Sequence, residues 1–430
     1  MFTRFRRLRR RWLVAFGVGL GIFIAVASAN FVRSEKKIQH IVFSPYGVED
    51  AQFVRAINTL LGPPLVGGNT VTELLNGDQI FPAMLDAIHG AQKTITFESF
   101  IYWSGRTGED FANAFSERAR AGVKVLILLD WLGSVKMESR LLDQMDKAGC
   151  QIERYHAPKW YHLTRLNNRT HRKVLVVDGK IGFTGGVGIG DEWAGHAQDP
   201  QHWRDTHFKV VGPVVAQMQA VFMVNWIKAR ATVEHTIEFL PPLEPAGNQF
   251  AQMFHSSPDE GSENIRLMYL LSIAAARRSI LLEQSYFVPD DLVVRMLVDA
   301  ATRGVAVNVI VPGEHTDTPH VRQASRSRWE ALLKAGVRIF EYKPTNLHAK
   351  IMVVDGIWSS VGSTNFDNRA FRINDEANLN VYDRAFAAQM EQTLAKDRAL
   401  AREVSYEEWR DRPWYVKLTD RFWALFRQQL

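Results

Sequence analysis

The chain has 430 residues, of which 46% are hydrophobic and 23% charged, a globular composition that excludes a disordered protein. Its net charge is +6, but seven arginines, two lysines and one glutamate give residues 1–40 a charge of +8, and the −2 that remains for the body argues against a groove for nucleic acid. The single cysteine, Cys150, excludes an intramolecular disulfide framework and a cysteine-rich zinc site, and no metal is expected.

The first 40 residues have the pattern of a membrane-targeting segment. Six arginines lie between Arg4 and Arg11, and residues 12–32 then run for 21 positions without a charge. A helix of that length rises roughly 30 Å, the hydrocarbon thickness of a bilayer. We therefore predict a single-pass anchor with a cytoplasmic N-terminus, although three basic residues beyond the run oppose this orientation. A cleaved signal peptide is the alternative, because residues 27–29, Ala-Ser-Ala, have the form of a cleavage site.

Beyond residue 40 the chain alternates between helical and strand patterns of apolar residues. The predicted helices cover 78–92, 108–121 and 139–148, and the predicted strands cover 94–102, 123–130, 173–177 and 180–184. Strands that alternate with helices predict an α/β fold in which helices cover a sheet.

The second half of the chain repeats the first at offsets of 177 to 187 residues. The matched blocks are 95–103 with 280–288, 118–129 with 300–311, 146–155 with 333–342, and 171–179 with 348–356. We therefore predict a duplicated α/β unit, with domains at 41–239 and 262–400, a proline-rich linker at 240–261 and a C-terminal tail at 401–430. Two such units commonly pack about a pseudo-twofold axis, which would bring equivalent edges into one shared site.

Each repeat contains the pattern H-x-K-x4-D, followed after six residues by Gly-Gly or Gly-Ser. The candidate catalytic residues are His171, Lys173 and Asp178 in the first copy and His348, Lys350 and Asp355 in the second. Side chains two apart on a strand share a face, so each copy places an imidazole beside a cation. Two such faces suit displacement at a phosphodiester: one histidine attacks phosphorus, the other protonates the leaving alkoxide, and the lysines neutralise the remaining oxygens.

The two motif aspartates are interpreted as anchors of a turn and strand end. Asp178 and Asp355 lie seven positions after their histidines, with the opposite parity on a strand, and each directly precedes a glycine. After the second copy, Ser363, Thr364 and Asn365 offer polar groups near a turn for binding phosphate oxygens.

A nucleophilic histidine needs a partner that fixes its tautomer and ring orientation. Two carboxylates, Asp205 and Glu376, follow their own motif histidines by 34 and 28 residues and precede strand-like runs. In a pseudo-symmetric pair of units, either carboxylate can support the histidine of either half.

The paired motifs resemble those of the phospholipase D superfamily over about residues 60–400. Within it, the N-terminal segment, the compact length and the stretches 168–193 and 202–213 resemble bacterial cardiolipin synthases. The resemblance implies two tandem α-β-α sandwich units and transfer of a phosphatidyl group from one phospholipid to the hydroxyl of another, phosphatidylglycerol, through a phosphohistidine without metal or cofactor. It also implies phospholipid and bilayer partners, a bacterial inner-membrane location, and orientation of the histidines by Asp205 and Glu376 across the interface.

The first copy departs from the family pattern at one position. The family often has asparagine three residues after the first glycine of the Gly-Gly or Gly-Ser pair, and the second copy keeps it as Asn365, whereas the first has Gly188. We expect the phosphate contact of this side chain in the second half alone.

Several alternatives stay open at the level of the sequence. A hydrolytic phospholipase D would use the same residues with water as the acceptor, a nuclease of the superfamily would need a basic channel, and a non-catalytic lipid-binding protein would need a decayed motif. His171 is our choice of nucleophile, with His348 as acid and base. The aromatic stripe in residues 414–426 fits either a membrane interface or a helix packed on the domain.

Overall fold

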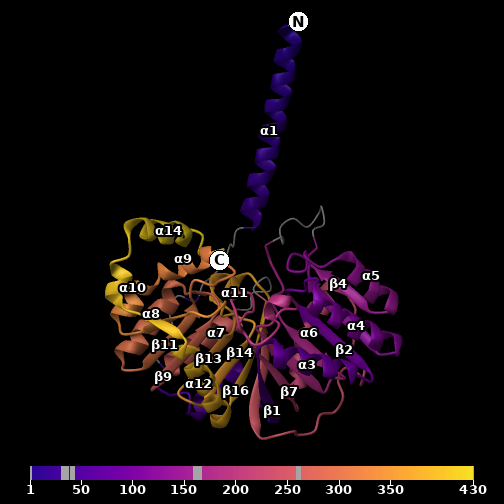
Figure 1. Cartoon of the computed structure of the whole chain (residues 1–430), viewed down its shortest axis with the longest axis vertical. Coiled ribbons are helices and arrows are strands. Elements are labelled where there is room, and N and C mark those ends of the chain that lie inside the picture. Colours follow the sequence, from indigo (N-terminus) through magenta and orange to yellow (C-terminus); the bar gives the residue numbers. More distant parts are fainter. Residues whose placement is uncertain (1, 31–37, 39–43, 158–166, 258–262, 430) are drawn as a thin grey trace.

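The computed structural model describes residues 2–30, 38, 44–157, 167–257 and 263–429, and its body is one long sheet covered by helices (Figure 1). The end of the predicted apolar run, 31–32, and the end of the predicted linker, 258–261, lie outside the described residues.

The sheet consists of two runs of strands that meet at β1 and β8. The first run, from the junction outward, is β1 (Val66–Leu75), β7 (Thr206–Val211), β6 (Ile181–Gly185), β5 (Val174–Val177), β2 (Thr94–Ser99), β3 (Lys124–Asp130) and β4 (Gln151–Tyr155). The second is β8 (Gln249–Ser256), β16 (Glu376–Tyr382), β14 (Trp358–Gly362), β13 (Lys350–Val354), β9 (Ser279–Gln284), β11 (Ala306–Pro312), β12 (Arg338–Tyr342) and β17 (Ala401–Val404).

The two runs have the same order of equivalent strands, and only β17 has no counterpart in the described first run. Each sequence repeat therefore folds in the same way. At the junction, β1 and β8 pair antiparallel. Antiparallel pairing of equivalent strands is the relation that a twofold axis produces, and it joins the halves into a single sheet of 15 strands.

Helices cover both faces of each half. In the first half, α3 (Asn76–His89), α4 (Arg106–Arg120) and α5 (Ser139–Ala148) lie on one face and α6 (Val215–Arg230) on the other. In the second half, α2 (Ala51–Leu60), α7 (Asn264–Ala275), α8 (Asp291–Thr302) and α10 (Trp329–Lys334) lie on one face and α12 (Arg384–Ala399) on the other. The remaining short elements are η2 (Asp191–Trp193), β10 (Phe287–Val288), α9 (Pro319–Arg326), β15 (Phe366–Asp367), α11 (Asn368–Arg372), α13 (Tyr406–Arg410) and α14 (Trp414–Ala424).

Strand β3 shows why the sheet needs helices on both sides. Its residues Val125, Ile127 and Leu129 pack into the core under α3–α5, whereas Leu126 and Leu128 pack against α6. Successive side chains of a strand point to opposite faces, so an unbroken apolar run demands an apolar layer on each face. The mixed α/β fold expected from the sequence is confirmed.

The segment predicted as a linker contributes a strand to the centre of the sheet. β8 occupies Gln249–Ser256 and pairs with both β1 and β16, and its residues Ala251 and Met253 are fully buried. At these eight residues the chain is a core strand and not a connecting loop. The several prolines around this stretch obscured the strand pattern in the sequence.

The N-terminal segment forms helix α1 (Phe2–Asn30), which projects away from the body (Figure 1). Its large apolar side chains, among them Trp12, Phe16 and Phe23, are exposed. Within the part of the chain that the structure describes, however, no helix is long and apolar enough to cross a membrane. The predicted single-pass anchor is therefore not supported.

Candidate active site

The first motif histidine is paired with a carboxylate of the other half. His171 precedes β5, and its Nδ1 lies 2.9 and 3.0 Å from the two carboxylate oxygens of Glu376, the first residue of β16. Both side chains are buried, and the ring of Phe100 packs edge-on against the imidazole at 5.1 Å. Because Nδ1 is engaged, Nε2 is the nitrogen of His171 that remains for chemistry.

The second motif histidine is paired in the equivalent way, with a carboxylate of the first half. Nδ1 of His348 lies 2.8 Å from Oδ2 of Asp205, which directly precedes β7 of the first half. The same carboxylate oxygen accepts a hydrogen bond from Trp193 Nε1 at 2.9 Å, and its other oxygen accepts from the backbone of Thr206. The imidazole also packs against the rings of Trp193 and Trp203, whose centroids lie 5.3 and 5.5 Å from its own.

Backbone hydrogen bonds across the halves hold each pair in place. The His171 amide donates to the carbonyl of Asp375 at 2.8 Å, and the His348 amide donates to the carbonyl of Arg204 at 2.7 Å. In both cases the accepting residue is the one before the partner carboxylate. Each histidine and its carboxylate are thus fixed by the same two crossing segments, so neither pair can form within one half.

The two lysines lie under the histidines. Lys173 Nζ donates to the carbonyl of His171 at 2.8 Å, and Lys350 Nζ contacts the carbonyl and both ring nitrogens of His348. Burial lowers the pKa of Lys173 to about 7, with the charge of Lys350 adding to the effect, and burial lowers the pKa of Lys350 to about 8. Buried ammonium groups of this kind favour an anionic ligand that restores their charge.

The two histidine–carboxylate pairs differ electrostatically. Burial raises the pKa of Glu376 to about 8, and burial together with the charges of Lys173 and Lys350 lowers the pKa of His171 well below its usual value. Burial also lowers the pKa of His348, but Asp205 opposes this. The pKa of Asp205 itself stays below its usual value because the charge and hydrogen bond of His348 outweigh burial. Both histidines therefore have lowered pKa values, and an ionised Asp205 opposes this lowering at His348.

The second residue of each Gly-Gly or Gly-Ser pair lies beside the carboxylate that holds a motif histidine. In the second half, Ser363 Oγ donates to Glu376 Oε2 at 2.5 Å. In the first half, a Cβ on Gly186 would lie 2.2 Å from Asp205 Oδ1, so only glycine leaves room for the carboxylate. Ser363 was expected to bind phosphate, but its hydroxyl is instead engaged with Glu376.

Of the other two polar residues after the second motif, one is hydrogen-bonded within the protein and one is open to a ligand. Thr364 Oγ1 donates to Asn378 Oδ1 at 2.7 Å, within its own half. Asn365 is buried, and its Oδ1 has no hydrogen-bond partner among the described residues, which leaves it available to a ligand. At the equivalent position of the first half, Gly188 is tightly packed against Ile101 and Trp193, so a side chain would not fit there.

The motif aspartates lie in turns and not with the histidines. The Asp178 carboxylate accepts from the backbone amides of residues 92–94 at 2.7 to 2.9 Å, and the Asp355 carboxylate accepts from those of residues 277–279 at 2.7 to 2.8 Å. Both residues have a positive φ, 51° and 52°. Each therefore ties the end of its hairpin to the start of the neighbouring strand, as the parity argument predicted. Both aspartates were predicted among the candidate catalytic residues, and the structure places their carboxylates on backbone amides.

Sequence reasoning missed several residues near the motifs, among them Arg169, two positions before His171. Its side chain is 3% exposed, lies 3.9 Å from Asp130 and stacks over Trp131 at 5.0 Å, yet Nε and Nη1 have no hydrogen-bond partner among the described residues. Arg169 has the same parity as His171 and Lys173, which is the signal that would have found it. Phe100, Trp193 and Trp203 carried no comparable signal.

The described residues contain no group of three or more histidine, cysteine, aspartate or glutamate side chains that could hold a metal ion. The groups that the site does offer are imidazole, carboxylate, ammonium and amide. They suit nucleophilic attack with proton transfer at a bound anion.

Comparisons with known proteins show which family the chain resembles. The family described as "Cardiolipin synthase, PLD-like domain" matches residues 84–198 and 269–398. Cardiolipin synthase A of Pseudomonas fluorescens is 36% identical over 359 residues, which are 83% of this chain and 74% of that protein. Cardiolipin synthase 2 of Staphylococcus epidermidis is 33% identical over 359 residues, which are 83% of this chain and 73% of that protein. The crystal structure of phosphatidylserine synthase from Haemophilus influenzae is similar in fold, with a TM-score of 0.67 at 14% identity over 88% of this chain and 100% of that chain.

Proposed function

Because the chain belongs to the cardiolipin synthase family with phospholipase D-like domains, and is a phosphatidyltransferase of the phospholipase D superfamily, we propose that it makes cardiolipin from two molecules of phosphatidylglycerol. The observation that carries the proposal is the pair of buried histidines, each held at Nδ1 by a carboxylate from the opposite half. This arrangement supplies two imidazoles with different proton affinities on one phosphodiester.

In the first step, Nε2 of His171 attacks the phosphorus of one phosphatidylglycerol. The bond from phosphorus to the glycerol headgroup breaks, and His348 donates its proton to the departing oxygen, which releases glycerol. A phosphatidyl group remains on His171. The difference between the two pairs supports this assignment, because Asp205 opposes the lowering of the His348 pKa, whereas burial and the charges of Lys173 and Lys350 lower the pKa of His171 well below its usual value.

In the second step, His348 accepts the proton of the headgroup hydroxyl of a second phosphatidylglycerol. The freed oxygen attacks phosphorus, the bond to His171 breaks, and cardiolipin leaves. Lys173 and Lys350 balance the charge of the phosphate oxygens in both steps, and the amide N–H groups of Asn365 donate hydrogen bonds to them. The low exposure of the histidines, 7% and 4%, favours a lipid alcohol over water as acceptor.

The test incubates the purified full chain with phosphatidylglycerol vesicles and follows the products. Cardiolipin and glycerol in equal amounts are the expected result, and the His171→Ala variant should form neither. Phosphatidic acid as the main product would identify a hydrolase that uses the same residues. If neither cardiolipin nor phosphatidic acid forms, both lipid activities are overturned.

A bacterial inner-membrane location with a cytoplasmic N-terminus remains a prediction from the charge pattern of residues 1–40. The domain limits at 41–239 and 262–400 remain a proposal in the same sense. Protease protection of the N-terminus in inverted and right-side-out bacterial membrane vesicles would test the location and orientation together.

A further inference from the structure

The last helix of the chain, α14, presents an apolar face to solvent. Trp414, Leu418 and Phe422 recur at helical spacing and are 73%, 54% and 53% exposed, and Leu425 just beyond the helix is 76% exposed. The opposite side packs on the body, where the ring of Trp423 lies 5.2 Å from that of His320. We call the four exposed residues the α14 face. Large apolar side chains clustered in this way mark an interaction surface.

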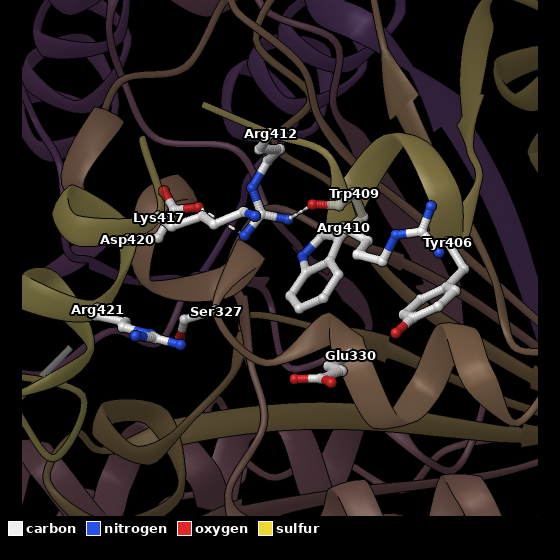
Figure 2. Close-up of a pocket in the computed structure, with 9 residues that line it drawn as sticks. All are labelled: Ser327, Glu330, Tyr406, Trp409, Arg410, Arg412, Lys417, Asp420 and Arg421. Carbon is white, nitrogen blue, oxygen red and sulfur yellow. Dashed lines mark hydrogen bonds and ion pairs between the residues drawn. The ribbon is translucent and has the colours of Figure 1, made fainter. Parts of the chain in front are cut away.

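A cavity of about 190 Å³ opens beside this face, between α10, α13 and α14 (Figure 2). Four basic and two acidic side chains line it: Arg410, Arg412, Lys417, Arg421, Glu330 and Asp420. Three ion pairs involve these residues: Glu330 with Lys334 at 2.8 Å, Asp420 with Arg412 at 3.2 Å, and Arg410 with Asp411 at 2.8 Å, so the surplus of charge lies with Lys417 and Arg421. The surplus of positive charge makes the cavity complementary to an anion.

The α14 face and the cavity are continuous through one helix. Lys417 and Arg421 line the cavity, and each lies one position from a residue of the α14 face. A helix with aromatic and aliphatic residues on one side and basic residues along the border has the anatomy of a segment that lies in a membrane interface.

The end of the chain ties this surface to the active-site region. Beyond α14, the carbonyls of Arg427 and Gln429 accept hydrogen bonds from Asn368 at 3.2 Å and Arg369 at 3.1 Å, both in α11. The charge of Arg369 adds to the lowering of the His171 pKa that burial and the lysines cause. Helices α14 and α11 and the C-terminus lie on the side of the body from which α1 projects (Figure 1).

We propose that the α14 face and the adjoining basic cavity dock the protein on a bilayer that contains anionic phospholipid. The apolar residues enter the boundary between headgroups and acyl chains, and Lys417 and Arg421 bind a lipid phosphate at the cavity. Four exposed apolar side chains bordered by basic residues favour this occupant over an acidic protein, which would pair with the charges alone. The inference goes beyond the proposed reaction, because it concerns where the enzyme meets its lipid and holds whichever phospholipid reacts.

A fluorescent label gives a local readout that is independent of α1. The chain has one cysteine, which is buried, so the full-length Cys150→Ala background allows a single polarity-sensitive dye at Leu425→Cys. We expect a blue shift on phosphatidylcholine vesicles that contain phosphatidylglycerol. The matched site Ile237→Cys, at a residue 70% exposed elsewhere, should not respond. No shift at position 425 would overturn the proposal, and a shift with polyglutamate in place of vesicles would identify an acidic protein as the partner.

The basic residues are tested in the same labelled chain. Lys417→Gln/Arg421→Gln should weaken docking by about fivefold for each charge removed, seen as a higher phosphatidylglycerol fraction at half-maximal shift. Arg140→Gln/Arg384→Gln removes two charges whose side chains are 56% and 58% exposed elsewhere, and should leave the titration unchanged. If the two double variants need the same phosphatidylglycerol fraction for half-maximal shift, Lys417 and Arg421 do not bind an anionic headgroup and that part of the proposal is overturned.

Activity separates this proposal from the proposed reaction. Leu418→Ser/Phe422→Ser should lose most activity on vesicles but keep it on a short-chain phosphatidylglycerol below its micelle concentration, with Ile237→Ser as control. Equal vesicle activity of this variant and the unaltered protein would overturn docking alone. An unaltered protein that is inactive on both substrates would overturn the reaction and leave the label result to decide docking.

Discussion

Two imidazoles with the same intrinsic acidity acquire different tasks from their neighbours. His171 is buried beside two lysines and a carboxyl group whose pKa is raised to about 8, whereas His348 faces a carboxylate that stays ionised. The energy difference between the protonated forms therefore comes from burial, from the cations around His171 and from the charge of Asp205 beside His348, and not from the rings themselves.

The assignment of the nucleophile predicts a burst. In His348→Asn, a phosphatidyl ester of p-nitrophenol needs no protonated leaving group, so His171 should release about one equivalent of nitrophenolate for each active site. The next step lacks its base and should be slower by roughly 10²–10⁴-fold. Rapid-mixing absorbance and mass spectrometry of an acid-labile phosphate on His171 check the prediction. His171→Asn should show no burst, and a burst with a phosphatidyl group on His348 in that variant would reverse the assignment.

The close approach of Gly186 to Asp205 predicts that the single methyl group added by Gly186→Ala lowers kcat strongly. A Cβ would lie 2.2 Å from the carboxylate, so Gly186→Ala should displace Asp205 and misorient His348. We expect kcat to fall by at least about 10²-fold while the circular dichroism spectrum is retained. Ser363→Ala removes a hydrogen bond to Glu376 without a clash and should cost less. Wild-type kcat in Gly186→Ala would contradict the role of Asp205.

The lysines predict the pH dependence of substrate capture. Below about pH 7 both ammonium groups are charged and attract the phosphodiester, and each loses its proton as the pH rises through about 7 for Lys173 and about 8 for Lys350. The measured kcat/KM should therefore fall through this window, mainly because KM rises. Lys350→Arg stays charged and should move the falling limb to higher pH at whatever activity it retains. A profile that is flat well above pH 8 would be inconsistent with these ammonium groups binding the substrate.

At the scale of elements, the motif aspartate is part of the hairpin and not of the chemistry. In each half it occupies a turn with positive φ and accepts three backbone amides from the start of the neighbouring strand. A carboxylate is the side chain with enough acceptor sites for three donors.

Removing this anchor should affect stability more than catalysis. Asp355→Ala leaves three amides without their acceptor and places alanine at a φ of 52°, which together cost on the order of 3 kcal/mol. We expect a lower Tm with nearly normal kcat per folded molecule, and an intermediate Tm for Asp355→Asn, since asparagine tolerates this backbone. A normal Tm with lost activity would return Asp355 to the catalytic residues.

At the scale of the whole molecule, the active site forms because each half supplies a carboxylate to the histidine of the other half. One chain supplies His171 and Asp205 from its first half and His348 and Glu376 from its second. We therefore expect that a mixture of purified His171→Ala and His348→Ala stays inactive, because no molecule in it holds both histidines. Recovery of up to a quarter of the activity on mixing and co-refolding would show that halves exchange between chains.

The sequence by itself determined the composition of this site and the family of the protein. The duplicated H-x-K pattern predicted the paired histidines and lysines, the parity of Asp178 and Asp355 predicted their turns, and alternating patterns predicted most elements of the first half. These features are local, because strand parity and turn chemistry act over a few residues.

Only the tertiary structure decided which carboxylate serves which histidine. Glu376 lies 205 residues from His171, and Asp205 lies 143 residues from His348, yet both contacts are under 3 Å at their shortest. Such contacts depend on how the two halves join, through β1 and a strand, β8, that the prolines concealed. The same packing explains why Gly186 has no side chain and why Asn365 has no counterpart at Gly188. Local patterns name the reacting groups, and long-range packing sets their partners and hence their acidity.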